Sequence, residues 1–221
     1  MRILLVEDDE ALGYGIRQWL MGESYTVDWV RNGLSAWNAV KLEHFDVMIL
    51  DIDLPKKSGI EVLKNIRDRG LSLPVMMISG HKELGFRLQC LDLGADDFLV
   101  KPFDLAELRS RIKAIYRRLT RSQADGSLKA GPLKLNGAKK EASLDGKPLE
   151  LPRREFALLQ LLMENVNQVV SLRQAMQSVY GWDRDIGSNA LEVHVHHLRK
   201  KIGSQMITTV RGSGYRLVTG D

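Results

Sequence analysis

Acidic, hydroxyl and lysine side chains follow successive short apolar segments within residues 1–119. Glu7, Asp8 and Asp9 come after the first segment, Asp51 after the third, Ser79 after the fourth and Lys101 after the fifth. Carboxylates that lie close together repel one another, so they need a compensating cation, and all-oxygen ligands suit a hard ion such as Mg²⁺. A carboxylate nucleophile, a metal ion, a lysine and a hydroxyl together suit phosphoryl transfer.

The apolar segments have the length of buried strands and occupy residues 3–6, 26–30, 47–50, 75–78 and 98–100. Helical patterns alternate with them. Their apolar stripes are Leu12, Ile16, Trp19 and Leu20, then Ile60, Leu63 and Ile66, then Leu84, Leu88 and Leu91, then Leu105, Leu108, Ile112, Ile115 and Leu119, with residues 34–43 as the remaining helix. The alternation predicts an α/β fold, a (βα)5 doubly wound parallel sheet. Ligands bind at the carboxyl ends of such strands, so polar residues at successive strand ends favour one shared site over ordinary loop-end charges.

The second half of the chain has a different pattern. Residues 120–127 are polar, lack hydrophobic periodicity and are interpreted as a linker. Beyond them, short strand candidates flank an Asp145-Gly146 turn, helices are expected at 153–165, 172–179 and 188–202, and a hairpin with a glycine-bearing tip is expected at 207–218. We therefore expect one domain over residues 1–119 and another over residues 128–221.

Charge is divided unequally between the two halves. Residues 1–121 carry 18 Lys and Arg against 18 Asp and Glu, whereas residues 122–221 carry 14 against 10. This asymmetry is expected where only the second part meets a polyanion, although a small basic excess is also common on solvated surfaces. The single cysteine, Cys90, excludes an intrachain disulfide and fits a reducing compartment. With no apolar run of ~20 residues and no signal-peptide pattern, we expect a cytoplasmic protein that does not cross a membrane.

Three motifs resemble those of response-regulator receiver domains: Leu5-Val6-Glu7-Asp8-Asp9, Leu50-Asp51-Ile52-Asp53-Leu54-Pro55 and Gly94-Ala95-Asp96-Asp97-Phe98-Leu99-Val100-Lys101-Pro102-Phe103. The resemblance covers residues 1–119 and implies that Asp51 accepts a phosphoryl group from a sensor histidine kinase. It implies that Glu7, Asp8, Asp51 and the backbone carbonyl of Asp53 hold Mg²⁺. Lys101, preceding a cis Pro102, would contact the phosphoryl group. Ser79 and Phe98 correspond to the family's switch pair, which selects an active packing of the fourth helix, fifth strand and fifth helix.

The same family forms a symmetric homodimer through ion pairs between subunits on the fourth and fifth helices. The corresponding charges here are Arg87, Asp97, Glu107, Arg111 and Arg118. Apart from the resemblance, these would be ordinary surface charges that contribute little.

Two positions depart from the commonest receiver pattern. Asp53 lies two residues after Asp51, and His81 lies two residues after Ser79. We hypothesise that they set the lifetime of the phosphoryl group by positioning or repelling the hydrolytic water. The alternative is that both side chains point into solvent.

The helix expected at 188–202 has a core stripe of Leu191, Val195, Leu198 and Ile202, with Ser188 as its expected N-cap. Its opposite face is therefore open to a partner. That face carries Asn189, Val193, His197 and Lys200, flanked by His194, His196, Arg199 and Lys201. Amide, imidazole and ammonium groups around one valine suit a DNA major groove, where the valine meets a thymine methyl group. A basic solvated face is the simpler alternative.

Several motifs in residues 128–219 look like the winged-helix effector of the OmpR/PhoB family. They are Arg153-Arg154-Glu155-Phe156, Val169-Val170-Ser171, Tyr180-Gly181-Trp182-Asp183, Val193-His194-Val195, Leu198-Arg199-Lys200-Lys201 and Thr209-Val210-Arg211-Gly212-Ser213-Gly214-Tyr215-Arg216. The resemblance implies a winged helix-turn-helix α+β domain whose recognition helix, 188–202, reads promoter DNA with direct repeats. Arg211 would reach the minor groove, while Thr209, Tyr215 and Tyr180 would touch phosphates. The loop 182–187 would face RNA polymerase.

His196 and His197 stand where many family members carry arginines, and Pro152 replaces a usual capping threonine. The histidines resemble the subgroup of polymyxin-resistance and quorum-sensing regulators. Because imidazole is mostly neutral at pH 7, we expect these histidines to make DNA binding sensitive to pH.

Two other functions remain open on the residues alone. Asp51-Ile52-Asp53 at a strand end, followed by Ser79 and Lys101, imitates the haloacid-dehalogenase phosphatases, in which the first Asp is a nucleophile and the second a general acid. Those enzymes usually carry this motif on an early strand and have a cap domain. A regulator that binds DNA without phosphorylation is the third possibility, and the complete acidic set argues against it.

Overall fold

The computed structural model describes residues 1–119, 127–137, 139–182 and 189–219. Within residues 117–119 it describes the backbone but not the side chains. The chain divides into two compact units, Met1–Leu119 and Thr120–Asp221. Each unit has its own hydrophobic core. In the part of the chain that the structure describes, no helix is long and apolar enough to span a membrane.

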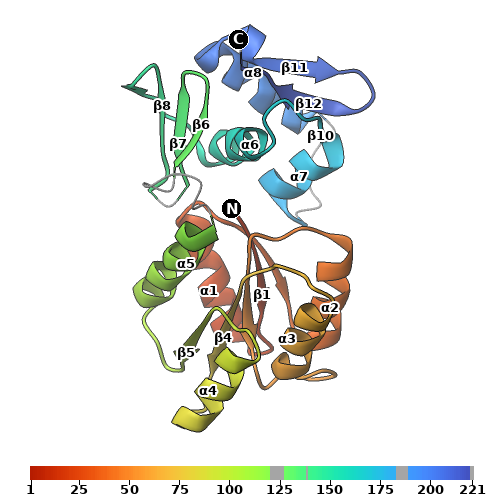
Figure 1. The fold of residues 1–221 in the computed structure, drawn as a ribbon, viewed down its shortest axis with the longest axis vertical. Helices are drawn as coiled ribbons and strands as arrows, with labels where there is room; N and C mark the ends of the chain where they lie inside the picture. The colour runs from red at the N-terminus through yellow and green to blue at the C-terminus, as the bar shows by residue number, and fades with distance from the viewer. Residues whose placement is uncertain (120–126, 138, 183–188, 220–221) are drawn as a thin grey trace. The chain divides into compact units, whose positions relative to one another are not determined.

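The first unit is built on a five-stranded parallel sheet in the order β2-β1-β3-β4-β5. Its strands are β1 (Arg2–Val6), β2 (Thr26–Val30), β3 (Val47–Asp51), β4 (Val75–Ser79) and β5 (Asp97–Val100). The helices are α1 (Glu10–Gly22), α2 (Gly33–Leu42), α3 (Gly59–Asp68), α4 (Leu84–Asp92) and α5 (Leu105–Leu119). The predicted (βα)5 fold is confirmed (Figure 1).

Alternate residues of each strand supply the two faces of this sheet. In β1, Ile3 and Leu5 join the core formed with α1 and α5, whereas Leu4 and Val6 join the core formed with α2 and α3. The central strands β1, β3 and β4 contain continuous apolar runs because both of their faces are covered. The carboxyl ends of the strands are left to the loops that carry the polar residues.

The apolar stripe predicted for α4 is wrong. Leu84, Leu88 and Leu91 are 59%, 49% and 37% exposed, while Cys90 is fully buried. The buried side of the helix is instead formed by Cys90 with the partly buried Phe86 and Leu93. Residues 84, 88 and 91 and residues 86, 90 and 93 have the same spacing, so periodicity alone could not choose between the two faces.

Two local features position the loops at the sheet edge. Asp9 caps α1 by accepting a hydrogen bond from the backbone of Leu12 at 2.9 Å. Gly59, the first residue of α3, packs so closely against the end of β3 that an added Cβ would lie 2.1 Å from the carbonyl oxygen of Asp51. Only glycine allows this helix to begin directly beside the strand end.

The second unit is α+β. An antiparallel sheet contains β6 (Ser127–Ala130), β7 (Leu133–Asn136), β8 (Glu141–Leu144) and β9 (Lys147–Pro148). Three helices follow, α6 (Arg153–Glu164), α7 (Leu172–Tyr180) and α8 (Ala190–Ile202). A second sheet has the strand order β10-β12-β11. It joins β10 (Val170–Ser171) to a final hairpin of β11 (Ile207–Val210) and β12 (Gly214–Leu217). A short 3₁₀ turn, Ser204–Met206, precedes the hairpin. This is the helix and hairpin content of a winged helix.

The start of α8 differs from the expectation. The helix begins at Ala190 with Asn189 at the N-cap position, two residues later than predicted, and no side chain caps it. Ser188, the expected N-cap, lies outside the described residues. The predicted core stripe is confirmed, because Leu191, Val195, Leu198 and Ile202 are all buried. Helix α6 begins after Pro152, likewise without a side-chain cap.

Candidate functional site

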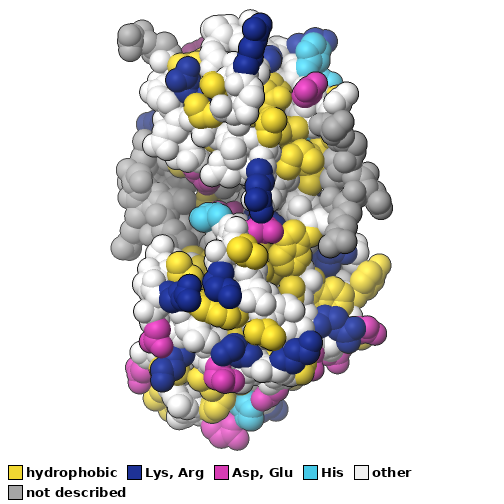
Figure 2. All heavy atoms as spheres, turned by 90° about the vertical axis from the view of Figure 1, so that its right-hand side faces the viewer, with side chains coloured by type: hydrophobic (Ala, Val, Ile, Leu, Met, Phe, Trp, Pro, Cys, Tyr) yellow, Lys and Arg dark blue, Asp and Glu magenta, His cyan; other side chains and the backbone are white. Residues whose placement is uncertain are grey.

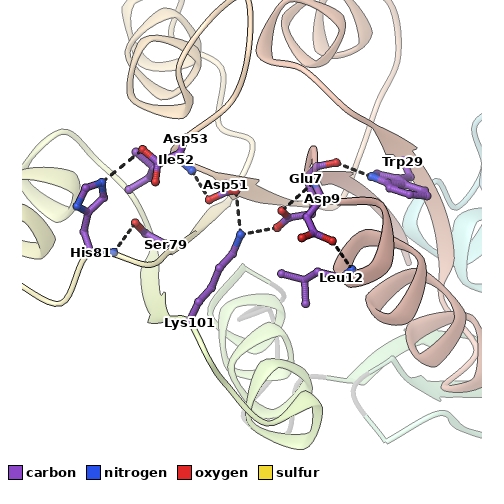
Figure 3. Close-up of polar contacts among 10 residues, drawn as sticks. All are labelled: Glu7, Asp9, Leu12, Trp29, Asp51, Ile52, Asp53, Ser79, His81 and Lys101. Carbon is purple, nitrogen blue, oxygen red and sulfur yellow. Dashed lines mark hydrogen bonds and ion pairs between the residues drawn. The ribbon is translucent and has the colours of Figure 1, made fainter.

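The predicted carboxylates of the first unit meet at the carboxyl edge of the sheet. Glu7 follows β1 and Asp51 ends β3, and both are buried, at 1% and 4% exposure. Lys101 follows β5, and its ammonium group donates to the carboxylates of Glu7 at 2.7 Å and Asp51 at 2.8 Å (Figure 3). The peptide bond between Lys101 and Pro102 is cis, as predicted. One oxygen each from Glu7, Asp8 and Asp51 lie within 4.8 Å of one another.

Burial and mutual charge control protonation at this edge. Burial raises the pKa of the Glu7 carboxyl to about 7, and the charge of Asp51 acts in the same direction, while the hydrogen bond from Lys101 opposes it. Burial lowers the pKa of the Lys101 ammonium, but hydrogen bonds with Asp51 and Glu7 outweigh this and leave the pKa raised. Lys101 therefore stays charged and holds together two carboxylates that would otherwise repel.

Asp53, Ser79 and His81 form a second group at the same edge. The backbone N–H of His81 donates to the Ser79 hydroxyl at 3.0 Å, and the imidazole Nε2 lies 3.3 Å from the Asp53 carboxylate (Figure 3). The ring of Phe86 lies 4.6 Å from that of His81. The two residues that depart from the receiver pattern therefore contact each other, bridging the loops after β3 and β4. Phe98, the other half of the predicted switch pair, is 5% exposed.

Sequence analysis missed two supports of the acidic loop, both contributed by the region around the end of β2. The indole N–H of Trp29 donates to the backbone carbonyl of Glu7 at 2.8 Å, and its ring packs on Gly13 of α1. The guanidinium of Arg31 donates to the carbonyl of Asp8 at 3.2 Å. The sequence carries no direct signal for either contact, because only the pairing of β1 with β2, which sets Val30 beside Val6, brings these residues together.

Three of the predicted dimer charges pair within one subunit. Arg111 contacts Asp97 at 3.0 Å and Glu107 at 2.8 Å. The hydrogen bond with Asp97, followed by that with Glu107, raises the pKa of Arg111. Arg87 is exposed on α4, and the side chain of Arg118 lies outside the described residues. On the face shown in Figure 2, basic and acidic side chains are interspersed over the first unit, in accord with its balanced charge.

Much of the predicted DNA-contact set on α8 is exposed. Val193 is 50% exposed, whereas Leu191, Val195, Leu198 and Ile202 of the same helix are buried. The exposed polar members are Asn189, His196, His197, Lys200 and Lys201, of which His197 and Lys201 also contact Glu155 of α6. Arg211 is exposed beside Gly212, which takes a φ of 72° at the tip of the β11–β12 hairpin.

Other members of that set hold the domain together. Arg199 donates to the backbone carbonyl of Ile207 at 2.9 Å and to the hydroxyl of the exposed Thr209 at 2.8 Å. Tyr180 and Tyr215 are only 7% and 5% exposed, and burial raises the pKa of both phenols. The predicted DNA-contact set therefore falls into two groups. Some of its side chains are exposed on α8, whereas Arg199, Tyr180 and Tyr215 support the packing of the domain. The loop expected to face RNA polymerase lies mostly outside the described residues.

Comparisons with known proteins identify both units. A model of the response regulator receiver domain matches residues 3–113, and a model of the transcriptional regulatory protein C terminal domain matches residues 146–217. The response regulator protein PmrA of Pseudomonas aeruginosa is 50% identical over 97% of each chain. The transcriptional regulatory protein QseB of Escherichia coli is 43% identical over 98% of this chain and 99% of that protein.

Solved structures agree with these assignments. The receiver domain of a Francisella response regulator superposes with a TM-score of 0.52 at 26% identity, covering 53% of this chain and 98% of that domain. The receiver match spans the Asp51-Ile52-Asp53 motif and overturns the phosphatase alternative. The relatives also match the subgroup suggested by the histidines of α8. The chain therefore belongs to the OmpR/PhoB family of two-component response regulators, which are transcription regulators and not enzymes: a histidine kinase acts on the receiver domain, and the C-terminal domain binds DNA.

Proposed function

We propose that Asp51 is the phosphoryl acceptor of the receiver domain, residues 1–119, and that its phosphorylation controls the DNA-binding domain through the linker. The linker was predicted at 120–127 and the domain at 128–221, but Ser127 already belongs to β6, so the domain begins one residue earlier. The observation that carries the proposal is the buried contact of Lys101 with Asp51 and Glu7. A carboxylate oxygen of Asp51 attacks the phosphorus of a kinase phosphohistidine, and the P–N bond breaks with the electron pair leaving on the histidine nitrogen. Lys101 is placed to neutralise the phosphoryl oxygens, and Ser79 to hydrogen-bond one of them.

The carboxylate set fits Mg²⁺. Three carboxylates offer oxygens within 4.8 Å of one another, which is the hard, all-oxygen donor set that this ion prefers. Glu7, Asp8, Asp51 and the backbone carbonyl of Asp53 would hold it. When bound, the ion supplies positive charge to the transferring phosphoryl group. A bound ion would also favour the ionised form of Glu7, opposing the burial that raises the pKa of this carboxyl.

The second half of the proposal concerns DNA. The exposed face of α8, with Val193 among its polar neighbours, would enter a major groove, and Arg211 at the hairpin tip would enter the adjacent minor groove. Phosphorylation would promote a homodimer through α4 and α5, so direct-repeat half-sites would be bound best. The loop 182–187 would contact RNA polymerase.

The decisive experiment labels the full chain with a small-molecule phosphodonor and Mg²⁺ and then selects DNA from a random pool. Wild type should incorporate one phosphoryl group and enrich direct repeats more strongly after labelling. Asp51→Asn should do neither, whereas Asp68→Asn, a matched change at an exposed carboxylate on α3, should behave as wild type. Stoichiometric labelling of the Asp51→Asn variant would contradict the acceptor assignment.

A further inference from the structure

A second cluster of titratable side chains lies in the DNA-binding domain, away from the carboxylates of the receiver. Glu155 lies in the first turn of α6, while His194 and His197 are three residues apart on α8. Each of the three offers one ligand atom, and these atoms lie within 4.8 Å of one another. Two helices far apart in the sequence thus bring a carboxylate and two imidazoles together.

The carboxylate of Glu155 is 3% exposed and is shared between two partners. One oxygen, Oε2, accepts a hydrogen bond from the ammonium of Lys201 at 2.8 Å, and that ammonium also donates to the backbone carbonyl of Glu150 at 3.0 Å. The other oxygen, Oε1, lies 3.2 Å from Nδ1 of His197. Lys201 therefore holds the carboxylate in place by one oxygen and leaves the other facing the imidazoles.

His194 is the least explained member of the cluster. Its Nδ1 is buried and has no hydrogen-bond partner among the described residues. Buried nitrogens without a partner are rare in folded proteins, and an absent ligand is one standard cause.

We propose that Glu155, His194 and His197 form a binding site for a divalent transition-metal ion of the Zn²⁺ type. Two imidazoles and one carboxylate are a recognised three-ligand set for Zn²⁺, with the fourth position open. In a tetrahedral Zn²⁺ site, adjacent ligand atoms are about 3.3 Å apart, given bonds of about 2.0 Å. The 3.2 Å between Oε1 of Glu155 and Nδ1 of His197 is a hydrogen-bond distance that also lies close to this spacing, so an ion could replace the proton between them. Mg²⁺ prefers oxygen ligands to imidazole nitrogens, so we expect this site to bind a different ion from the receiver site.

The position of the site links it to DNA recognition, and this part of the inference rests on the proposed function. His197 is 49% exposed by its side chain and belongs to the open face of α8. A bound ion would fix the ring of His197 and add positive charge beside the phosphates of a bound duplex. DNA affinity should therefore rise when the ion is present, with the greatest effect at low salt.

Co²⁺ is a direct probe of the site in the full-length protein. Mg²⁺ in large excess is present throughout, so that the receiver carboxylates are occupied. Wild type should develop the intense visible absorption of four-coordinate Co²⁺ at one equivalent, and Zn²⁺ should abolish it. His197→Gln, at an exposed position that leaves folding intact, should bind at least ten-fold more weakly. His196→Gln, the neighbouring exposed histidine, and Asp51→Asn should retain the signal.

Several results would overturn the proposal. Absence of the four-coordinate spectrum, its persistence in His197→Gln, or its loss in Asp51→Asn would each exclude this site. The coupling is tested separately by fluorescence anisotropy with a selected DNA duplex, with and without Zn²⁺. A several-fold gain in affinity for wild type that is lost in His197→Gln supports it. A normal Co²⁺ spectrum with no change in DNA affinity refutes the coupling alone, and failure of DNA binding under every condition refutes the proposed function instead.

Discussion

The contact of Lys101 with two buried carboxylates should make this lysine a large contributor to the stability of the receiver domain. Lys101→Met keeps the aliphatic stem but removes the ammonium, which donates to Glu7 at 2.7 Å and Asp51 at 2.8 Å. Charge-assisted hydrogen bonds contribute roughly 1.5–3 kcal/mol each, and removing one partner of a buried ion pair costs roughly 3–5 kcal/mol.

Two observations reduce that estimate for this site. The side chain of Lys101 is 21% exposed, so water already screens part of the interaction. Glu7 has a pKa of about 7, so it can take up a proton at neutral pH at little cost and relieve the repulsion from Asp51. We therefore expect Lys101→Met to lower the free energy of unfolding by about 2–3 kcal/mol in the absence of divalent ions.

Urea unfolding followed by tryptophan fluorescence suits the measurement, because Trp19, Trp29 and Trp37 lie in the first unit and Trp182 alone in the second. Saturating Mg²⁺ should recover most of the loss, since an ion at 100 times its Kd stabilises by about 2.7 kcal/mol. Lys64→Met, which removes an exposed lysine from α3, is the matched control and should change stability by less than about 0.5 kcal/mol. The reasoning fails if Lys101→Met is no less stable than this control without metal. If Mg²⁺ does not restore the stability lost in Lys101→Met, the inference about the ion pair still holds, but the proposed metal site is contradicted.

Three further outcomes are expected. Gly59→Ala should destabilise the receiver by more than about 2 kcal/mol in calorimetry, because the added Cβ would lie 2.1 Å from the carbonyl oxygen of Asp51. The control Gly85→Ala, at a helical position with open space around it, should be neutral or stabilising. Asp53→Ala and His81→Ala should each change the half-life of phosphorylated protein in a radiolabel chase, since the two side chains meet at 3.3 Å beside Ser79, and unchanged half-lives would sink that idea. Lys200→Ala should weaken binding to all duplexes similarly in anisotropy titrations, and it should reduce the slope of the logarithm of the binding constant against the logarithm of salt concentration by about 1. A loss of affinity confined to one DNA sequence would instead indicate that Lys200 contacts a base.

Most of the receiver could be predicted because its physical signals agree with one another. Parallel strands buried on both faces produce continuous apolar runs, and their common direction gathers Glu7, Asp51, Ser79 and Lys101 at one edge. Helix α4 was the exception. Two overlapping stripes, one through Leu88 and one through Cys90, satisfy the same period, and only tertiary packing decides which is buried.

The DNA-binding domain was less predictable at the level of single side chains. Helical periodicity placed Val193 and Lys200 on the open face, as the structure has them. It carries no information about contacts across the domain, and so it could not foresee that Tyr180 is buried or that Arg199 is bound to the hairpin. Glu155 stands out in the sequence only within the motif Arg153-Arg154-Glu155-Phe156, and its contacts with His197 and Lys201 of α8 depend on how α6 and α8 pack.

The contact of Arg199 with the final hairpin has a mechanical consequence. One guanidinium joins the last turn of α8 to β11 through Ile207 and Thr209, so the helix is tied to the strand that leads to Arg211. If α8 enters a major groove and Arg211 the adjacent minor groove, as proposed, this tie restricts the offset between the two grooves that the domain can enter. Under that proposal, a duplex whose minor groove lies at a different offset from its major groove must itself deform to be bound, and affinity would depend on DNA shape as well as on base sequence.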